Sequence, residues 1–414
     1  MEQLDIVDCH EHLGPEKERT DSPQDVFTLF TQYTNCDLNS AGMDRASWKG
    51  QEWPFEREKP VYDSLFDYDV PLKKRWEIFK PWWEKIRYGS YARAALLTAK
   101  KVYGFDDISD ETYEGLSEAI SAENTPGIYK RMLCDRCNIK ASLTQCHRTD
   151  IKRPLVPVMQ AVLLHSVAGR DQLEDIAQRY GFDVPGSLDE MIDFADKILQ
   201  NWLDEGAVGI KVISRNFPQV DKKDAEKAFK KILNIKEPDA EAVEPLRDYL
   251  FHRIIDIATE KDLVVAVHAG IWGDFREIDS KFMLKIASAH PQTKFDLYHL
   301  GMPSVRDTIV IAKNYPNVFL NLCWSHIISQ SQCCSGIDEL LDQVPINKIL
   351  AFGGDYIRPV EKVVGHLYMA RENFAKVFGS RIDRELMSFE QACKILKLWF
   401  WDNPLELYNR LSID

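Results

Sequence analysis

Eight short apolar segments rich in β-branched residues recur along this chain, and amphipathic helical patterns such as 187–205 and 242–260 alternate with them. This alternation indicates a parallel sheet whose strands are buried on both faces. Eight β/α units predict an α/β fold of the (β/α)8 TIM-barrel type. The eight segments are 4–8, 138–144, 155–164, 207–213, 263–268, 294–299, 317–322 and 348–353.

A doubly wound sheet is the alternative fold for this pattern. It would be expected to carry a glycine-rich phosphate-binding turn after its first strand, where this chain has histidines instead. One polar and aromatic stretch, at about 15–125, does not follow the β/α rhythm. We expect it to be a mainly helical insertion after the first strand, within a single domain spanning 1–414. Such an insertion suits a cap over the substrate or a subunit interface, so a homo-oligomer is one expectation.

Composition excludes several partners. The net charge of −13 argues against binding to nucleic acid or an anionic membrane, because both favour clustered Lys and Arg. There is no apolar run of membrane-spanning length and no basic, apolar leader at the N-terminus. The nine cysteines are scattered, and the Cys134–Cys137 pair has no second pair to complete a structural zinc site. Reduced thiols in a cytoplasmic enzyme are the favoured interpretation.

Histidines gather where the predicted strands end. Active-site groups of TIM barrels lie at the C-terminal ends of the strands, and six of the ten histidines fall there. His10 and His12, one residue apart, point to the same side of a strand and can reach one ion. Imidazoles and a carboxylate suit Zn²⁺ with one position left for a water whose pKa the ion lowers to ~7. The six histidines are His10, His12, His147, His165, His268 and His299.

Four motifs resemble the amidohydrolase superfamily, and within it the metal-dependent TIM-barrel hydrolases related to uronate isomerase. They are His10-Glu11-His12, Val267-His268-Ala269-Gly270, Leu297-Tyr298-His299-Leu300-Gly301 and Phe352-Gly353-Gly354-Asp355. The resemblance extends over nearly the whole chain.

The resemblance implies a ligand set and catalytic roles. His10, His12, His268 and Asp355 would hold a divalent metal, most often zinc, with manganese as the alternative. His299 would be a ligand to a second metal or a catalytic group that orients the substrate. Asp355 would also take the proton from an attacking water.

Lys211 in the fourth strand is the ambiguous catalytic candidate. A strand-four lysine is carboxylated and bridges two metals in binuclear members of the superfamily, whereas the relatives of uronate isomerase use one metal. Its ammonium could equally bind a substrate carboxylate or pair with an acid. We expect one ion, and two if Lys211 is carboxylated.

Several further residues near strand ends predict how substrate is held. Arginines around the barrel mouth would favour a carboxylated small molecule through bidentate hydrogen bonds. Trp324 and Trp272 would form an apolar wall, and His326 follows the seventh strand closely enough to touch substrate. The arginines are Arg148, Arg170, Arg215 and Arg358.

These residues predict a metal-dependent hydrolase that cleaves an amide, lactone or related carbonyl bond of a small substrate. A uronate-type isomerase or a non-oxidative decarboxylase on the same scaffold is the first alternative. A non-catalytic binding or scaffold barrel is the second, because fold alone does not determine function.

Overall fold

Eight parallel strands form one sheet in a computed structural model that describes residues 1–47, 58–146, 148, 150–234, 240–271 and 274–413. Each strand pairs with the next along the chain, from β1 to β8. The backbone amide of Cys9 donates to Phe352, and that of Asp355 donates to His10, which nearly closes the barrel. The predicted TIM barrel is confirmed. The strands are β1 (Ile6–Glu11), β2 (Ile139–Cys146), β3 (Leu155–Gln160), β4 (Gly209–Ile213), β5 (Val264–His268), β6 (Phe295–Leu297), β7 (Val318–Asn321) and β8 (Ile349–Leu350).

Both faces of the strands are buried, as the unbroken apolar runs of the sequence require. Neighbouring residues along a strand join different apolar clusters, because successive side chains point to opposite faces. Val7 and Val264 belong to one cluster, which also contains Tyr408 near the end of the chain. Ile6 and Val265 belong to the larger cluster, which includes side chains of the outer helices.

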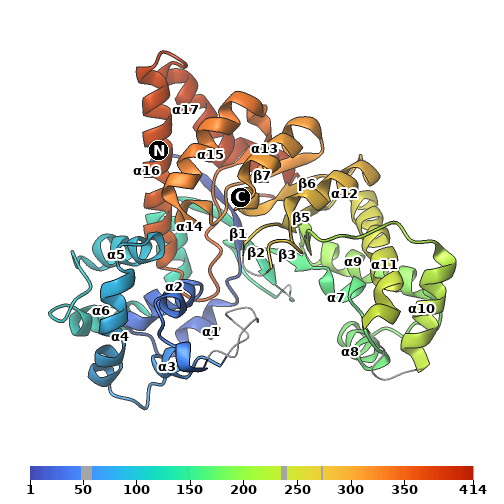
Figure 1. The fold of residues 1–414 in the computed structure, drawn as a ribbon, viewed down its shortest axis with the longest axis horizontal. Helices are drawn as coiled ribbons and strands as arrows, with labels where there is room; N and C mark the ends of the chain where they lie inside the picture. Colours follow the sequence, from blue (N-terminus) through green and yellow to red (C-terminus); the bar gives the residue numbers. More distant parts are fainter. Residues whose placement is uncertain (48–57, 147, 149, 235–239, 272–273, 414) are drawn as a thin grey trace.

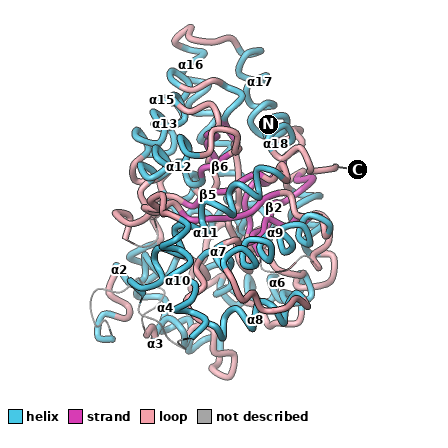
Figure 2. Tube along the Cα trace, turned by 90° about the vertical axis from the view of Figure 1, so that its right-hand side faces the viewer, coloured by secondary structure: helices cyan, strands magenta, loops and turns pink. Residues whose placement is uncertain are grey.

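Helices surround the strands, which lie at the centre of the molecule in Figure 2. None of the helices within the described ranges is long and apolar enough to cross a bilayer. The helices that follow β3 are α7 (Val162–His165), α8 (Arg170–Tyr180), α9 (Leu188–Asp204), α10 (Lys222–Asn234), α11 (Ala240–Glu260), α12 (Met283–Ala289), α13 (Val305–Asn314), α14 (Ser325–Ile328), α15 (Gln330–Gln343), α16 (Lys362–Asp383), α17 (Phe389–Lys397) and α18 (Asn403–Leu407).

The described residues between β1 and β2 are mainly helical and build a core of their own, on the opposite side of the strands from α8 and α10 in Figure 1. Phe79 and Trp83 are completely buried in this core. The segment packs tightly on α16, since a Cβ on Gly365 would lie 2.3 Å from the carbonyl oxygen of Ala94. Its helices are α1 (Glu16–Thr20), α2 (Thr34–Ser40), α3 (Pro60–Ser64), α4 (Leu72–Ile86), α5 (Ser90–Tyr103) and α6 (Tyr113–Glu123).

Candidate metal centre and active site

His10, His12 and Asp355 converge at the junction of β1 with the segment after β8. Asp355 Oδ1 lies 3.1 Å from His10 Nε2 and 3.3 Å from His12 Nε2. Ligands about 2.1 Å from one tetrahedral ion are separated by about 3.4 Å, so these distances fit a metal. Asp355 Oδ1 is buried yet accepts no hydrogen bond within the described residues. This unsatisfied oxygen between two imidazole nitrogens is the strongest structural indication of a cation site.

Buried acids beneath the three residues fix the two strand ends. Asp8 Oδ1 accepts the backbone N–H groups of His10 and Gly354, and Glu11 Oε2 accepts that of Tyr356 at 2.6 Å. A Cβ on Gly354 would lie 1.8 Å from Glu11 Oε1, so only glycine fits there. Burial raises the pKa of Asp8 to about 6, and burial together with Asp8 raises the pKa of Glu11. The acids therefore act on the site through the backbone of its ligands.

Gln32 and Tyr33, which the sequence did not single out, also reach this site. The Gln32 amide donates to the carbonyl oxygen of Asp355 and accepts the N–H of Ile357 at 2.7 Å. Gln32, Tyr33 and Asp355 all have positive φ, at 48°, 54° and 59°, a conformation that non-glycine residues adopt only when their surroundings enforce it. Burial and the nearby Asp355 carboxyl hold the pKa of Tyr33 well above its usual value, so its phenol stays protonated.

His268 and His299 form a hydrogen-bonded pair beside the ligand group. His268 Nδ1 lies 3.1 Å from His299 Nε2, and His268 Nε2 lies 3.2 Å from the carbonyl oxygen of Ile271. His299 Nδ1 faces Cys323, 3.1 Å from its carbonyl oxygen and 3.5 Å from its sulfur. Burial lowers the pKa of both histidines, that of His268 to about 3. The structure thus places His268, an expected metal ligand, against His299 and outside the His10–His12–Asp355 group.

Lys211 lies on β4, buried near the two histidine groups. Its Nζ donates to Gln145 Oε1 at 2.6 Å and lies 4.3 Å from the centre of the Tyr298 ring. Burial lowers the pKa of Lys211 to about 8, while the carboxyl group of Asp355 opposes that shift. An amide oxygen and an aromatic face are partners for an ammonium group, so this environment suits an uncarboxylated lysine.

Three of the four arginines expected to bind substrate are exposed outside the cavity described below. Arg148 pairs with Glu18 at 2.7 Å and with Asp150, and Arg170 on α8 pairs with Glu174 at 2.7 Å. Arg215 follows β4 and is also exposed. Ion pairs of this exposed kind are weak, and none of the three arginines joins the cavity beside His12.

Trp324 and His326 lie within the protein interior instead of facing an open site. Both are completely buried. The indole of Trp324 donates to the Tyr91 hydroxyl at 3.2 Å, and His326 Nε2 lies 2.9 Å from the carbonyl oxygen of Ala351. Neither is exposed for the substrate contact expected of it, because each strand-end backbone turns its side chain toward the helical layer. His147 and Trp272 lie outside the described residues.

One cavity, of 230 Å³, opens beside the metal ligand candidates. His12, whose side chain is 28% exposed, is the candidate ligand that lines it. Arg358 is exposed at this cavity, whereas Arg19 is buried and neutralised by Glu361 at 2.9 Å. The cavity combines residues of the insertion with residues near β1 and β8: His12, Gly14, Pro15, Glu18, Arg19, Ser22, Gln24, Tyr129, Ile357 and Arg358.

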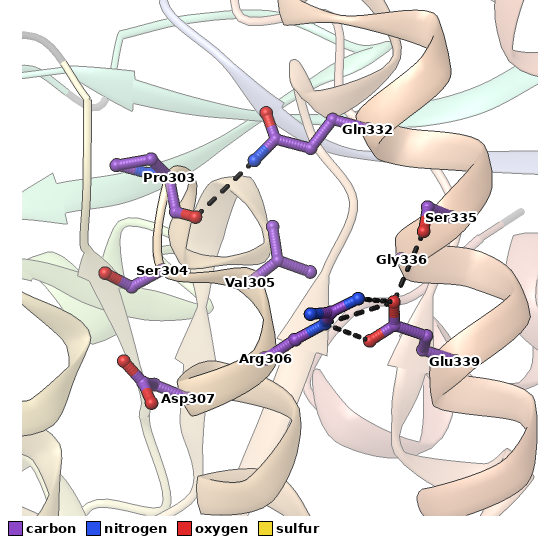
Figure 3. A pocket seen from close by; sticks show the side chains of 9 residues that line it. All are labelled: Pro303, Ser304, Val305, Arg306, Asp307, Gln332, Ser335, Gly336 and Glu339. Carbon is purple, nitrogen blue, oxygen red and sulfur yellow. Dashed lines mark hydrogen bonds and ion pairs between the residues drawn. The ribbon is translucent and has the colours of Figure 1, made fainter.

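A larger hollow, of 400 Å³, lies between α13 and α15 and contains none of the candidate ligands. Figure 3 shows Arg306 directed at Glu339, with which it forms an exposed ion pair of 2.9 Å. The Gln332 amide points toward the carbonyl oxygen of Pro303, at 3.4 Å. Arg306 and Gln332 are therefore paired within the hollow, and Asp307 pairs with Lys281 outside it.

The fold and this group of side chains define a class: a (β/α)8 barrel with potential metal ligands at its strand ends. The chain belongs to the amidohydrolase family, whose model matches residues 165–410. That family is typically metal-dependent and acts on small substrates. A search of curated proteins finds no match.

Solved structures share the fold across the whole chain. The uronate isomerase of Thermotoga maritima is 16% identical, with a TM-score of 0.77 over 99% of this chain and 95% of that one. The glucuronate isomerase of Caulobacter crescentus is 17% identical, with a TM-score of 0.77 over 99% and 92%. A provisionally assigned metal-dependent hydrolase of Lactobacillus casei is 15% identical, with a TM-score of 0.66 over 100% and 98%. Identities this low establish the fold alone.

Proposed function

We propose that the protein is a metal-dependent aldose–ketose isomerase acting on a small sugar acid. The observation that carries the proposal is a polar cavity in which the exposed guanidinium of Arg358 and the candidate ligand His12 share one space. A sugar acid offers an anionic carboxylate for the arginine and a carbonyl with an adjacent hydroxyl for an ion. The likeness to two uronate isomerases over nearly their full lengths supports the same choice.

We propose His10, His12 and Asp355 as the residues that hold one divalent ion, zinc or manganese. Two imidazoles and a carboxylate leave coordination positions for substrate oxygens. When bound, the ion would polarise the substrate carbonyl and make the neighbouring carbon more acidic. His268 is not included, because both its ring nitrogens already have protein partners.

The chain's own groups supply the proton transfers. Isomerisation moves one proton from C2 to C1 and one from the C2 hydroxyl to the C1 oxygen, without net water uptake. Asp355, beside His12 and the open cavity, is placed to accept and return the carbon-bound proton. The protonated phenol of Tyr33 can donate to a substrate oxygen. We assign His299 and the Lys211 ammonium to stabilising the negative charge that develops on the substrate.

The insertion has a place in this proposal as a cap. Glu18, Arg19, Ser22 and Gln24 come from the insertion, and they line the same cavity as His12 and Arg358. Substrate held there would contact the insertion and the barrel together. The exclusion of water by such a cap would strengthen the charged contacts inside.

Hydrolysis of an amide, lactone or related carbonyl bond is the second candidate. Asp355, beside His12 and the open cavity, is equally placed to take a proton from an attacking water. The family name and the likeness to the Lactobacillus casei protein favour this reaction. The two reactions differ in one measurable respect, because hydrolysis consumes water and isomerisation does not.

The test combines metal analysis with product analysis. We expect the purified protein to contain about one equivalent of zinc or manganese, and the His10→Ala/His12→Ala variant to contain none. Incubation with D-glucuronate in D2O should yield a ketose that carries solvent deuterium at C1, as read by NMR. Water-consuming cleavage of lactones or amides without isomerisation would support the second candidate, and carbon dioxide release would indicate a decarboxylase. Failure to bind metal after reconstitution would overturn both and leave the scaffold alternative.

A further inference from the structure

We propose that a second, deeper metal position exists in this barrel, held by His10, His299 and Cys323 and selective for soft divalent cations such as Cd²⁺. It rests on the proposed function only in sharing His10 with the ligand set assigned above. Each of the three residues offers a ligand atom, and these atoms lie within 4.8 Å of one another. An ion at this position would compete with the catalytic ion for His10 and would act as an inhibitor.

The geometry matches a tetrahedral ion with a sulfur ligand. The sulfur of Cys323 lies 3.5 Å from His299 Nδ1. A sulfur about 2.3 Å and a nitrogen about 2.1 Å from the same tetrahedral zinc ion would be separated by about 3.5 Å. A Cβ on Gly353 would lie 2.4 Å from Cys323 Cβ and 2.8 Å from His10 Cβ, so this glycine lets the two residues approach. His10 Nδ1 is buried and has no hydrogen-bond partner in the described part of the chain.

The number of protons shared by His268 and His299 favours a free lone pair on His299 Nδ1, at the proposed metal position. The chain of contacts runs from the Ile271 carbonyl through His268 and His299 to the Cys323 carbonyl, and each of its three links needs one proton. Two neutral rings supply two protons. When His268 donates to Ile271, it accepts from His299 Nε2, which leaves His299 Nδ1 as a bare lone pair. The Cys323 thiol can then donate to that nitrogen, which favours this arrangement.

The two positions differ in ligand type and in access. The first offers a carboxylate oxygen and includes the partly exposed His12, whereas the second offers a thiol and three residues that are at most 1% exposed. Thiolate ligands favour soft cations, and carboxylates favour hard ones such as Mn²⁺. Binding at the deeper position replaces the S–H bond of Cys323 by a sulfur–metal bond, and the displaced proton leaves to the solvent. We therefore expect slow occupation and selectivity for Cd²⁺ over Mn²⁺.

The experiment titrates metal-free protein with Cd²⁺ and follows the ultraviolet charge-transfer band of a cadmium–thiolate bond. The intact protein should develop the band, and Cys323→Ser should lose it with at least about a tenfold weaker affinity for Cd²⁺. The matched control Cys393→Ser, at an exposed cysteine, should keep it. His12→Ala, which removes a ligand of the first position only, should also keep it. Thermal unfolding of each variant identifies any that fail to fold.

The outcomes separate this proposal from the proposed function. No band in the intact protein, or an equal band in Cys323→Ser, would overturn the deeper position whatever the catalytic reaction is. Where isomerase activity is found, Cd²⁺ added to the Mn²⁺-loaded enzyme should inhibit it progressively. Each enzyme's rate with Cd²⁺ should be divided by its own rate without Cd²⁺, and this ratio should stay near one for Cys323→Ser. Equal inhibition of Cys323→Ser and the intact enzyme would contradict competition for His10. The band remains a valid readout even if no isomerase activity appears.

Discussion

The two sides of the barrel mouth use histidine in opposite ways. On the β8–β1 side, His12 borders an open cavity, and Asp355 Oδ1 accepts no hydrogen bond from any residue that the structure describes. On the β5–β6 side, His268 is held at both ring nitrogens, by Ile271 and His299. Both sides have a histidine at the end of a strand. The difference teaches that a strand-end position brings a side chain to the site. Whether that side chain can hold a metal depends on whether its nitrogen or oxygen atoms are still without hydrogen-bond partners.

The largest effect should come from removing the unsatisfied oxygen. Asp355→Asn replaces a charged ligand and proposed base by a neutral amide, so kcat/KM should fall by at least about 10³-fold together with the metal content. Steady-state kinetics and elemental analysis would measure both. His290→Ala, a buried histidine outside the mouth, serves as the control and should keep its metal. A metal-replete, active Asp355→Asn enzyme would contradict the ligand set on the β8–β1 side.

Substitution of His268 on the β5–β6 side should lower activity without removing the metal. His268→Ala should retain about one equivalent of metal, because its ring nitrogens are committed to Ile271 and His299. We expect kcat to fall by about 10- to 100-fold as His299 loses the partner that fixes its orientation. Elemental analysis beside kinetics checks this, with His12→Ala as the comparison that should lose metal. Complete metal loss in His268→Ala would make the two sides equivalent and break the comparison.

A smaller effect should distinguish the cavity arginine from the paired ones. Arg358→Ala should raise KM by about tenfold or more, because a charged hydrogen bond to a substrate carboxylate contributes about 1.5–3 kcal/mol. Arg148→Ala and Arg170→Ala should change KM by less than about twofold, since neither arginine lines the cavity and each is held by an acid, Arg148 by Glu18 and Arg170 by Glu174. Initial-rate measurements over a range of substrate concentrations test all three. A large KM effect at Arg170 would relocate the substrate to the other side of the mouth.

The smallest effect concerns His165, expected at a strand end but found at the end of α7, where it packs edge-on against Phe217 and Phe251. Burial lowers the pKa of His165 from 6.5 to about 3, so the unfolded chain binds its proton more readily than the folded one. Stability is therefore intact above pH 6.5 and is lost as pH falls from 6.5 toward 3. When the pH falls from 7 to 5.5, the free energy of unfolding should decrease in the intact protein by about 1.3 kcal/mol more than in His165→Phe. Urea denaturation at both pH values measures this, and equal losses would contradict the assignment.

Much of the barrel could be predicted because its signal is local. Buried parallel strands read as continuous apolar runs, and those runs lie where the strands are found. Their ends were less precise: the segment expected at 155–164 is a strand only through Gln160 and then turns into α7. The final segment, expected at 348–353, is a strand only at Ile349 and Leu350. The residues beyond the two strand ends, 161–164 and 351–353, are themselves apolar or glycine, so the apolar pattern does not show where each strand stops.

The candidate site was predictable only as a set of positions. The spacing of His10 and His12 and the Asp355 motif brought three side chains to one point. Both ring nitrogens of His268 are occupied, by the carbonyl of Ile271 and by His299, and no sequence pattern encodes those contacts. Which of the four arginines would face the cavity could not be predicted, because position in the chain does not specify whether a nearby acid pairs with an arginine. Gln32 had no signal at all, since it lies in the insertion, away from every predicted strand end.

The contact from Gln32 to the backbone on both sides of Tyr356 bears on how this enzyme can change over evolution. Loops of a TIM barrel are ordinarily exchangeable parts that vary while the strands persist. Here one side chain of the insertion holds the carbonyl of Asp355 and the amide of Ile357. A replacement insertion would have to supply the same two hydrogen bonds before any new cavity could function. The insertion and the proposed ligand Asp355 would therefore be inherited together, and new specificity would be more accessible through cavity residues such as Ser22 and Gln24 than through exchange of the whole segment.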